Sequence, residues 1–75
     1  MQPARLNQTR RNLTRREFEL LVGVADGKTT TRIARDWHTS RHTTKDQAKM
    51  VREKLNANTM AHAVAIGFRQ GLLPL

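Results

Sequence analysis

Residues 29–55 constrain the fold most strongly, because their pattern predicts two helices joined by a three-residue turn. A hydroxyl residue, Thr29 or Thr30, stands where the N-cap of the first helix is expected. The apolar residues that follow share one helical face and are Ile33, Ala34 and Trp37. The pattern stops at His38, so this helix is predicted to be short, about two turns.

The second helix of this segment is longer and amphipathic. Ser40 is suited to cap its N-terminus. The positions predicted to point inward are Thr44, Ala48, Val51 and Leu55. The opposite face is charged and mainly cationic, with Lys45, Asp46, Lys49, Arg52 and Glu53. A helix with such an outer face has the shape and the charge to enter the major groove of DNA.

The basic residues are concentrated on this pair of helices. The chain has 14 Lys and Arg against 6 Asp and Glu, a formal net charge of +8. Residues 28–54 hold eight of the basic and three of the acidic residues, a net of +5. A second basic group precedes the first acid and consists of Arg5, Arg10, Arg11, Arg15 and Arg16. Binding to a polyanion is the simplest interpretation, because a surface that is merely solvated usually mixes both signs.

Composition argues against several other classes of protein. The chain has no cysteine, and His38, His42 and His62 lack the paired spacing of a zinc site, so no metal or other cofactor is predicted. The scattered carboxylates and the lack of a nucleophile–histidine or glycine-rich phosphate-binding pattern argue against an enzyme. No apolar run approaches the roughly 20 residues of a membrane span, and no apolar signal region is present. We therefore expect a soluble, cytoplasmic, nucleoid-associated protein.

The chain is predicted to contain one domain behind a short tail. Residues 1–12 show no periodicity and are predicted to form a basic flexible tail, whose arginines either lie along DNA or have no role. The domain is predicted at residues 13–73 and is all-α, with four helices. The initial Met1 favours a complete protein over a cut domain.

The first helix of the domain is predicted to start after Thr14. Thr14 and Glu17 have the spacing of a capping box, and Leu13 is placed to pack against the entry of the helix. The apolar stripe consists of Leu20, Leu21, Val24 and Ala25. Gly27 is suited to a left-handed C-cap, and Gly23 is expected to permit close approach of another helix.

A fourth helix is predicted over about residues 60–70, and its outer face is expected to form a dimer contact. Asn56 is suited to end the preceding helix in a left-handed conformation, and Thr59 to cap the next. The core-facing residues are predicted to be Met60, Ala63, Val64 and Gly67. The predicted two-fold contact comprises Ala61, His62, Ala65, Ile66 and Arg69. The alternative is that Ile66 is an isolated surface residue or is covered by the C-terminal leucines.

The residues between about 13 and 72 resemble the LuxR/GerE family of bacterial helix-turn-helix transcription regulators. LTRRE followed by LL resembles the opening of the family, and ADGKT and Ile33-Ala34 resemble its turn and second helix. The third and fourth helices match the family pattern at Ser40, Thr43, Lys45, Val51, Lys54, Leu55, Ala63, Val64, Gly71 and Leu72. The resemblance implies a four-helix DNA-binding domain whose third helix enters the major groove and whose fourth often forms a dimer contact.

Four positions depart from the family pattern. The glutamate before the Ile-Ala pair is replaced by Arg32, which removes half of a second capping box. The usual turn glycine, valine and histidine are replaced by His38, Thr44 and Gln47. These departures affect the expected DNA sequence more than the fold.

The resemblance also implies which residues contact DNA. Base edges are assigned to Lys45, Asp46 and Lys49. Phosphates are assigned to Thr29, Arg41, His42, Thr43 and Lys54, with the N-terminal amides of the third helix. For Arg41, His42 and Lys54 the alternative is ordinary surface polarity. Asp46 either accepts from cytosine, repels phosphate, or is only a surface acid near Lys45 or Lys49. Trp37 is expected to pack in the core and not to stack on a base.

The leading hypothesis is a standalone transcription regulator that binds double-stranded DNA as a homodimer. One alternative is a promoter-recognition module like the fourth region of bacterial sigma factors, which contacts RNA polymerase. Another is a module that holds an acidic protein with its basic face. The apolar end of the chain, AVAIGFRQGLL, favours the LuxR/GerE hypothesis over the sigma-factor one.

Overall fold

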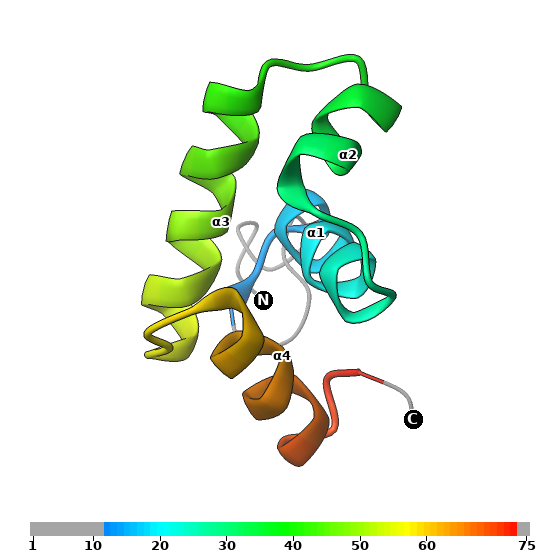
Figure 1. The fold of residues 1–75 in the computed structure, drawn as a ribbon. Helices are drawn as coiled ribbons and strands as arrows, with labels where there is room; N and C mark the ends of the chain where they lie inside the picture. The colour runs from blue at the N-terminus through cyan, green and yellow to red at the C-terminus, as the bar shows by residue number, and fades with distance from the viewer. Residues whose placement is uncertain (1–11, 74–75) are drawn as a thin grey trace, which may run out of the picture.

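The computed structural model describes residues 12–73, and within them all of the regular structure is helical. The four helices are α1 (Arg15–Ala25), α2 (Thr30–Asp36), α3 (Arg41–Leu55) and α4 (Met60–Arg69) (Figure 1). The prediction of an all-α fold with four helices is therefore confirmed. The predicted tail lies outside the described residues, apart from Asn12. Within the described part of the chain, no helix has the length and apolarity needed to cross a membrane.

Each helix begins at the hydroxyl residue that the sequence predicts. The Thr14 Oγ1 accepts from the Glu17 amide at 3.1 Å, and the Glu17 Oε1 accepts from the Thr14 amide at 2.9 Å, which closes the capping box. The other three N-caps are Thr29, Ser40 and Thr59, and each accepts an amide hydrogen bond of 3.0 Å. Side chains therefore satisfy amide groups that the start of a helix leaves without intrahelical partners.

All four helices end in the same way, with one residue in the left-handed conformation. These residues are Gly27, His38, Asn56 and Gly71, with φ angles of 94°, 55°, 56° and 74°. In the turn after α2, the Thr39 amide donates to the Ala34 carbonyl at 3.0 Å and the His38 amide to the Arg35 carbonyl at 3.2 Å, which is a Schellman motif. The motif lengthens the connection between α2 and α3 to the four residues 37–40, one more than predicted.

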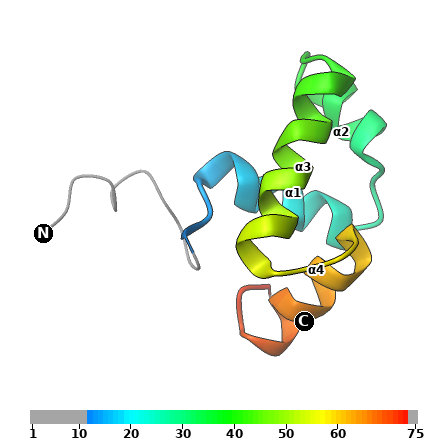
Figure 2. The ribbon, with the colours of Figure 1, turned by 90° about the vertical axis from the view of Figure 1, so that its left-hand side faces the viewer.

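Helices α1 and α3 form the centre of the packing, because each of them contacts all three other helices. Figure 1 shows α3 along one side of the domain, α2 at its N-terminal end and α4 at its C-terminal end, and Figure 2 shows the same order from the side. The predicted inner face of α3 is confirmed, since Thr44, Ala48, Val51 and Leu55 are each at most 3% exposed. The buried Thr44 hydroxyl donates to the Ser40 carbonyl at 3.2 Å, so it is not left unsatisfied.

Gly23 brings α1 and α2 close together, as predicted. A Cβ atom at Gly23 would lie 2.9 Å from Ile33 Cδ1, which is closer than real Cβ contacts. Ile33 is 2% exposed and belongs to the hydrophobic core. The free-energy cost of glycine inside a helix, about 1 kcal/mol, is therefore offset by the packing of Ile33 against the α1 backbone.

The prediction that Ile66 lies on the outer face of α4 is wrong. Ile66 is only 7% exposed and belongs to the hydrophobic core. The chain reverses at Gly71, which buries Leu72 and Leu73, and a Cβ at Gly67 would lie 2.8 Å from Leu73 Cδ1. The C-terminal leucines therefore cover the face that carries Ile66 and Gly67. The exposed residues of α4 are Ala61, Ala65, Phe68 and Arg69.

Candidate nucleic-acid interface

The predicted DNA-contacting residues of α3 lie together on the outer face of its first half. The exposed residues there are Arg41, His42, Thr43, Lys45, Asp46 and Lys49. They share this face because the inner positions of the helix are occupied by core residues, so the remaining positions point to solvent. Within the described residues, Arg41, Lys45, Lys49 and Arg52 have no acidic partner within 4.0 Å. Helix α3 thus keeps four cations available for an external anion.

The two threonines predicted to contact phosphate already take part in capping. Thr29 Oγ1 accepts from the Arg32 amide at the start of α2. Thr43 Oγ1 accepts from the Ser40 hydroxyl at 2.9 Å, and Ser40 Oγ accepts in turn from the Thr43 amide. These bonds order the N-termini of α2 and α3, where amide groups and the helix dipole favour an anion.

Asp46 lies one helical turn from His42. The His42 Nε2 and Asp46 Oδ2 atoms are 3.4 Å apart, and both side chains are largely exposed. The two side chains form an ion pair only when the imidazole is protonated. Because both groups are solvated, the contact holds Asp46 only weakly.

Lys54 is held within the domain and does not project from the end of α3. Its ammonium donates to Glu17 Oε1 at 2.8 Å and to the Asn12 carbonyl at 3.1 Å. Only 24% of the Lys54 side chain and 10% of the Glu17 side chain are exposed. The sequence-based assignment of Lys54 to phosphate overlooked this pair because its two members are 37 residues apart.

The Lys54–Glu17 pair also changes the acidity of the carboxyl group. Burial raises the pKa of Glu17, but the hydrogen bonds from Lys54 and from the Thr14 amide, with the charge of Lys54, outweigh that effect. The pKa of Glu17 is therefore lowered from its ordinary value of 4.5. The ionised carboxylate joins the N-terminus of α1 to the C-terminal end of α3.

Two further basic residues are paired around Asp36. Arg32 Nε and Lys28 Nζ lie 3.1 and 3.3 Å from the oxygens of Asp36. The hydrogen bond from Arg32 is the main cause of a lowered pKa at Asp36, despite some desolvation. Arg32, which stands where the family has glutamate, thus forms an i,i+4 pair that stabilises α2.

Trp37 packs against the core, as predicted. It is half-buried beside the core cluster, and the Arg16 guanidinium carbon lies 4.2 Å from the centroid of its ring. A small cavity of about 140 Å³ opens beside this pair and is lined by Arg16, Trp37, Thr39 and Gln47. The Gln47 Oε1 atom is buried there without a hydrogen-bond partner in the described residues.

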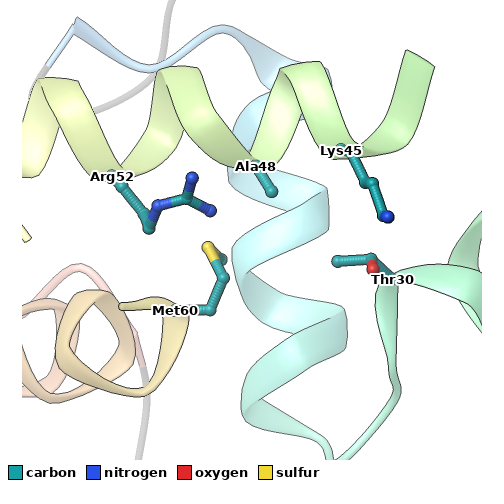
Figure 3. A pocket seen from close by; sticks show the side chains of 5 residues that line it. All are labelled: Thr30, Lys45, Ala48, Arg52 and Met60. Carbon is teal, nitrogen blue, oxygen red and sulfur yellow. The ribbon is translucent and has the colours of Figure 1, made fainter. Parts of the chain in front are cut away.

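A larger groove lies between α2, α3 and α4 (Figure 3). Its volume is about 310 Å³, and it is lined by Thr30, Lys45, Ala48, Arg52 and Met60. Figure 3 shows the Lys45 and Arg52 side chains leaving α3 on the same flank, with Ala48 between them. The sequence predicts Arg52 on the charged face of α3 but indicates no role for it. Arg52 follows Lys45 by seven residues, which is about two helical turns, so both residues lie on the same flank of α3. This spacing was the signal that could have identified Arg52.

The predicted dimer residues divide into exposed and covered positions. Ala61, Ala65 and Arg69 are exposed, and His62 is half-buried, with its Nδ1 accepting from the Asn58 amide at 3.2 Å. Ile66 is buried, as described above. Phe68, which sequence analysis did not include, is 36% exposed on the same helix. Phe68, and not Ile66, is therefore the large apolar side chain on the exposed face of α4.

Comparison with models of protein families gave a match over most of the chain. The family model described as bacterial regulatory proteins, luxR family, matches residues 11–66. The match includes α1, α2, α3 and the first part of α4. A search of curated proteins gave no match.

Proposed function

Because the chain belongs to the luxR family of bacterial regulatory proteins, a family of DNA-binding transcription regulators, we propose that it binds double-stranded DNA sequence-specifically and inserts α3 into the major groove. The observation that carries this proposal is the outer face of α3, where the cations have no acidic partner within the described residues. Because these cations project from one rigid helix, the backbone needs no rearrangement for them to meet phosphates and base edges.

The exposed middle of α3 supplies the base-reading residues of this proposal. Lys45 and Lys49 are suited to guanine O6 and N7, and Asp46 is suited to the amino group of cytosine. The phosphate contacts of the proposal are Arg41, His42, Thr43 and Thr29, near the N-termini of α3 and α2. The ordered caps at both termini support these positions, because they fix the backbone amides that face the anion.

A homodimer on DNA is the second part of the proposal, with α4 as the contact. Ala61 and Ala65 are exposed one turn apart and permit close approach of a second helix. Phe68 continues this stripe and supplies apolar area, while His62 and Arg69 lie at its margins. A two-fold contact of this kind would present two α3 helices to successive major grooves about 34 Å apart.

Selection of bound sequences from random duplexes tests the proposal directly. We expect an enriched motif made of two half-sites in inverted orientation, bound with a steep salt dependence of about 0.9 in log K per phosphate contacted. Equal recovery of all sequences would contradict sequence-specific binding. Tight binding to core RNA polymerase or to an acidic protein, with no sequence preference on DNA, would instead support the two alternative hypotheses.

A further inference from the structure

The groove between α2, α3 and α4 has cations at both ends and an apolar middle. Arg52 and Met60 face each other at one end, Lys45 and Thr30 lie at the other, and Ala48 lies between the two ends (Figure 3). Arg52 and Lys45 are seven residues apart in α3, which corresponds to about 10 Å along the helix axis. The groove therefore presents positive charge, apolar surface and positive charge in sequence.

Arg52 is partly withdrawn from solvent in this groove. It is half-buried, its guanidinium points along the groove towards Ala48, and no acid of the described residues lies within 4.0 Å of it. A partly desolvated cation without a partner gains free energy when an anion binds beside it. The geometry thus favours an anionic occupant that also has apolar surface.

We propose that this groove binds a segment of the DNA sugar–phosphate backbone, with Arg52 holding one phosphate. The proposal rests on the proposed function, because it places the backbone beside an α3 that lies in the major groove. A helix in a major groove about 12 Å wide has a phosphate strand along each flank. Each phosphate of the backbone is joined to a less polar sugar, which matches the position of Arg52 beside Ala48 and Met60. A planar guanidinium binds phosphate in a bidentate way.

This assignment moves a phosphate contact from Lys54 to Arg52. The two residues are separated by about 200° around the helix, so they lie on opposite flanks of α3. Lys54 has its acceptors, Glu17 and Asn12, within the domain. Arg52 opens into the groove and lies on the same flank as Lys45.

The test compares Arg52→Gln with Arg35→Gln, which removes the same charge from an exposed position in the last turn of α2. Binding is measured against a one-half-site duplex selected by the unaltered protein and against a random duplex of equal length. We expect Arg52→Gln to weaken both complexes by a similar factor, about tenfold, and to lower the salt slope by about 0.9. Arg52→Lys should restore the slope and only part of the affinity. Arg35→Gln should leave both quantities unchanged.

A second measurement locates the phosphate. Duplexes in which single phosphates are replaced by neutral methylphosphonates are bound to the unaltered protein, to Arg52→Lys and to Arg52→Gln. We expect one position whose neutralisation weakens the unaltered protein but has no further effect on Arg52→Gln. If Arg52→Gln loses its helical circular-dichroism spectrum, the comparison of the unaltered protein with Arg52→Lys decides in its place.

Three results would overturn the groove assignment while leaving the proposed function intact. These are an unchanged affinity and salt slope in Arg52→Gln, a loss of sequence preference in that variant, or no methylphosphonate position that distinguishes the proteins. A further result would also overturn the groove assignment. If the unaltered protein binds polyglutamate, and Arg52→Gln loses that binding but binds duplex DNA normally, the groove binds an acidic protein. Absence of sequence preference in the unaltered protein contradicts the proposed function itself.

Discussion

Helices α3 and α4 both bury one face in the same core, but their outer faces differ in chemistry. The outer face of α3 carries Arg41, Lys45 and Lys49, whereas the exposed positions of α4 include Ala61, Ala65 and Phe68. Charged groups are costly to bury, so the charges of α3 leave only one way for this helix to pack. Helix α4 has apolar residues around most of its circumference, and more than one orientation would bury a similar area.

The orientation of α4 is decided by the chain that follows it. The left-handed Gly71 reverses the backbone and places Leu72 and Leu73 in the core, at 3% and 5% exposure. Leu73 then packs against the face that contains Gly67 and Ile66. The two helices therefore differ in what decides which side faces solvent. In α3 the charged residues decide it, and in α4 the packing of the following chain decides it.

The largest expected effect comes from a charge placed on the covered side of α4. Ile66→Glu should unfold the domain, because it removes a core side chain and buries an unpaired carboxylate, at a cost of several kcal/mol. A chain of this size has only about 4 to 11 kcal/mol of stability. Thermal melting followed by circular dichroism measures the effect.

Phe68→Glu is the matched control on the exposed side of α4. It should destabilise the domain far less than Ile66→Glu, by about 1 kcal/mol because Phe68 is partly covered, and should abolish cooperative occupation of two half-sites. An Ile66→Glu variant that melts like the unaltered protein would show that α4 is oriented differently. An unchanged cooperativity in Phe68→Glu would place the dimer contact elsewhere.

The next largest effect concerns the bond between α1 and α3. Glu17→Ala should destabilise the domain by about 2 to 4 kcal/mol, because it removes half of a capping box and leaves Lys54 partly buried without its acid. Glu17→Gln keeps a side chain that can complete the box and should cost about 1 to 2 kcal/mol. Denaturant unfolding at pH 7 measures both changes, and equal losses for the two variants would show that the charge of Glu17 contributes nothing.

The same pair predicts a pH dependence of stability. Because the pKa of Glu17 in the folded protein is lower than its ordinary value of 4.5, the ionised carboxylate stabilises the fold fully above that value. This stabilisation is lost as the pH falls through the folded-state pKa. The difference in stability between the unaltered protein and Glu17→Gln should therefore shrink below about pH 4.5. A difference that stays constant down to pH 3 would contradict the ion pair.

A smaller effect, seen in specificity and not in stability, tests the outer face of α3. Lys49→Ala should lose about 1 to 3 kcal/mol of discrimination between the selected and a random duplex, while melting normally. Arg41→Ala is the control, since it lies at the first position of α3 and should weaken binding to both duplexes alike. Equal losses on the two duplexes for Lys49→Ala would remove it from the base-reading residues.

Much of the fold could be predicted because its signals are local. The four N-caps and the inner face of α3 depend on residues within one or two helical turns, and all were predicted correctly. The Lys54–Glu17 pair and the burial of Ile66 depend on contacts that no periodicity encodes. The groove was missed for the same reason, because Met60 and Thr30 line one groove with Arg52 only in the folded chain.

The smallest predicted effect lies in the turn that joins α2 to α3. His38 has a φ of 55°, a conformation in which a side chain with a Cβ is strained and glycine is not. His38 is exposed, so its imidazole contributes little packing that glycine would lose. His38→Gly should therefore stabilise the domain by up to about 1 kcal/mol, after the greater backbone freedom of glycine in the unfolded chain is included. This corresponds to a rise in melting temperature of about 4 to 8 °C.

Asn56 provides the matched control for that prediction. It has nearly the same φ, 56°, at the end of α3, but asparagine tolerates the left-handed conformation better than other residues with a Cβ. Asn56→Gly should therefore raise the melting temperature less than His38→Gly does. A lower melting temperature in His38→Gly would mean that the imidazole makes a stabilising contact in the turn. In that case the free energy of this connection would depend on a side-chain contact, as the orientation of α4 does, and not on the local conformation of the backbone.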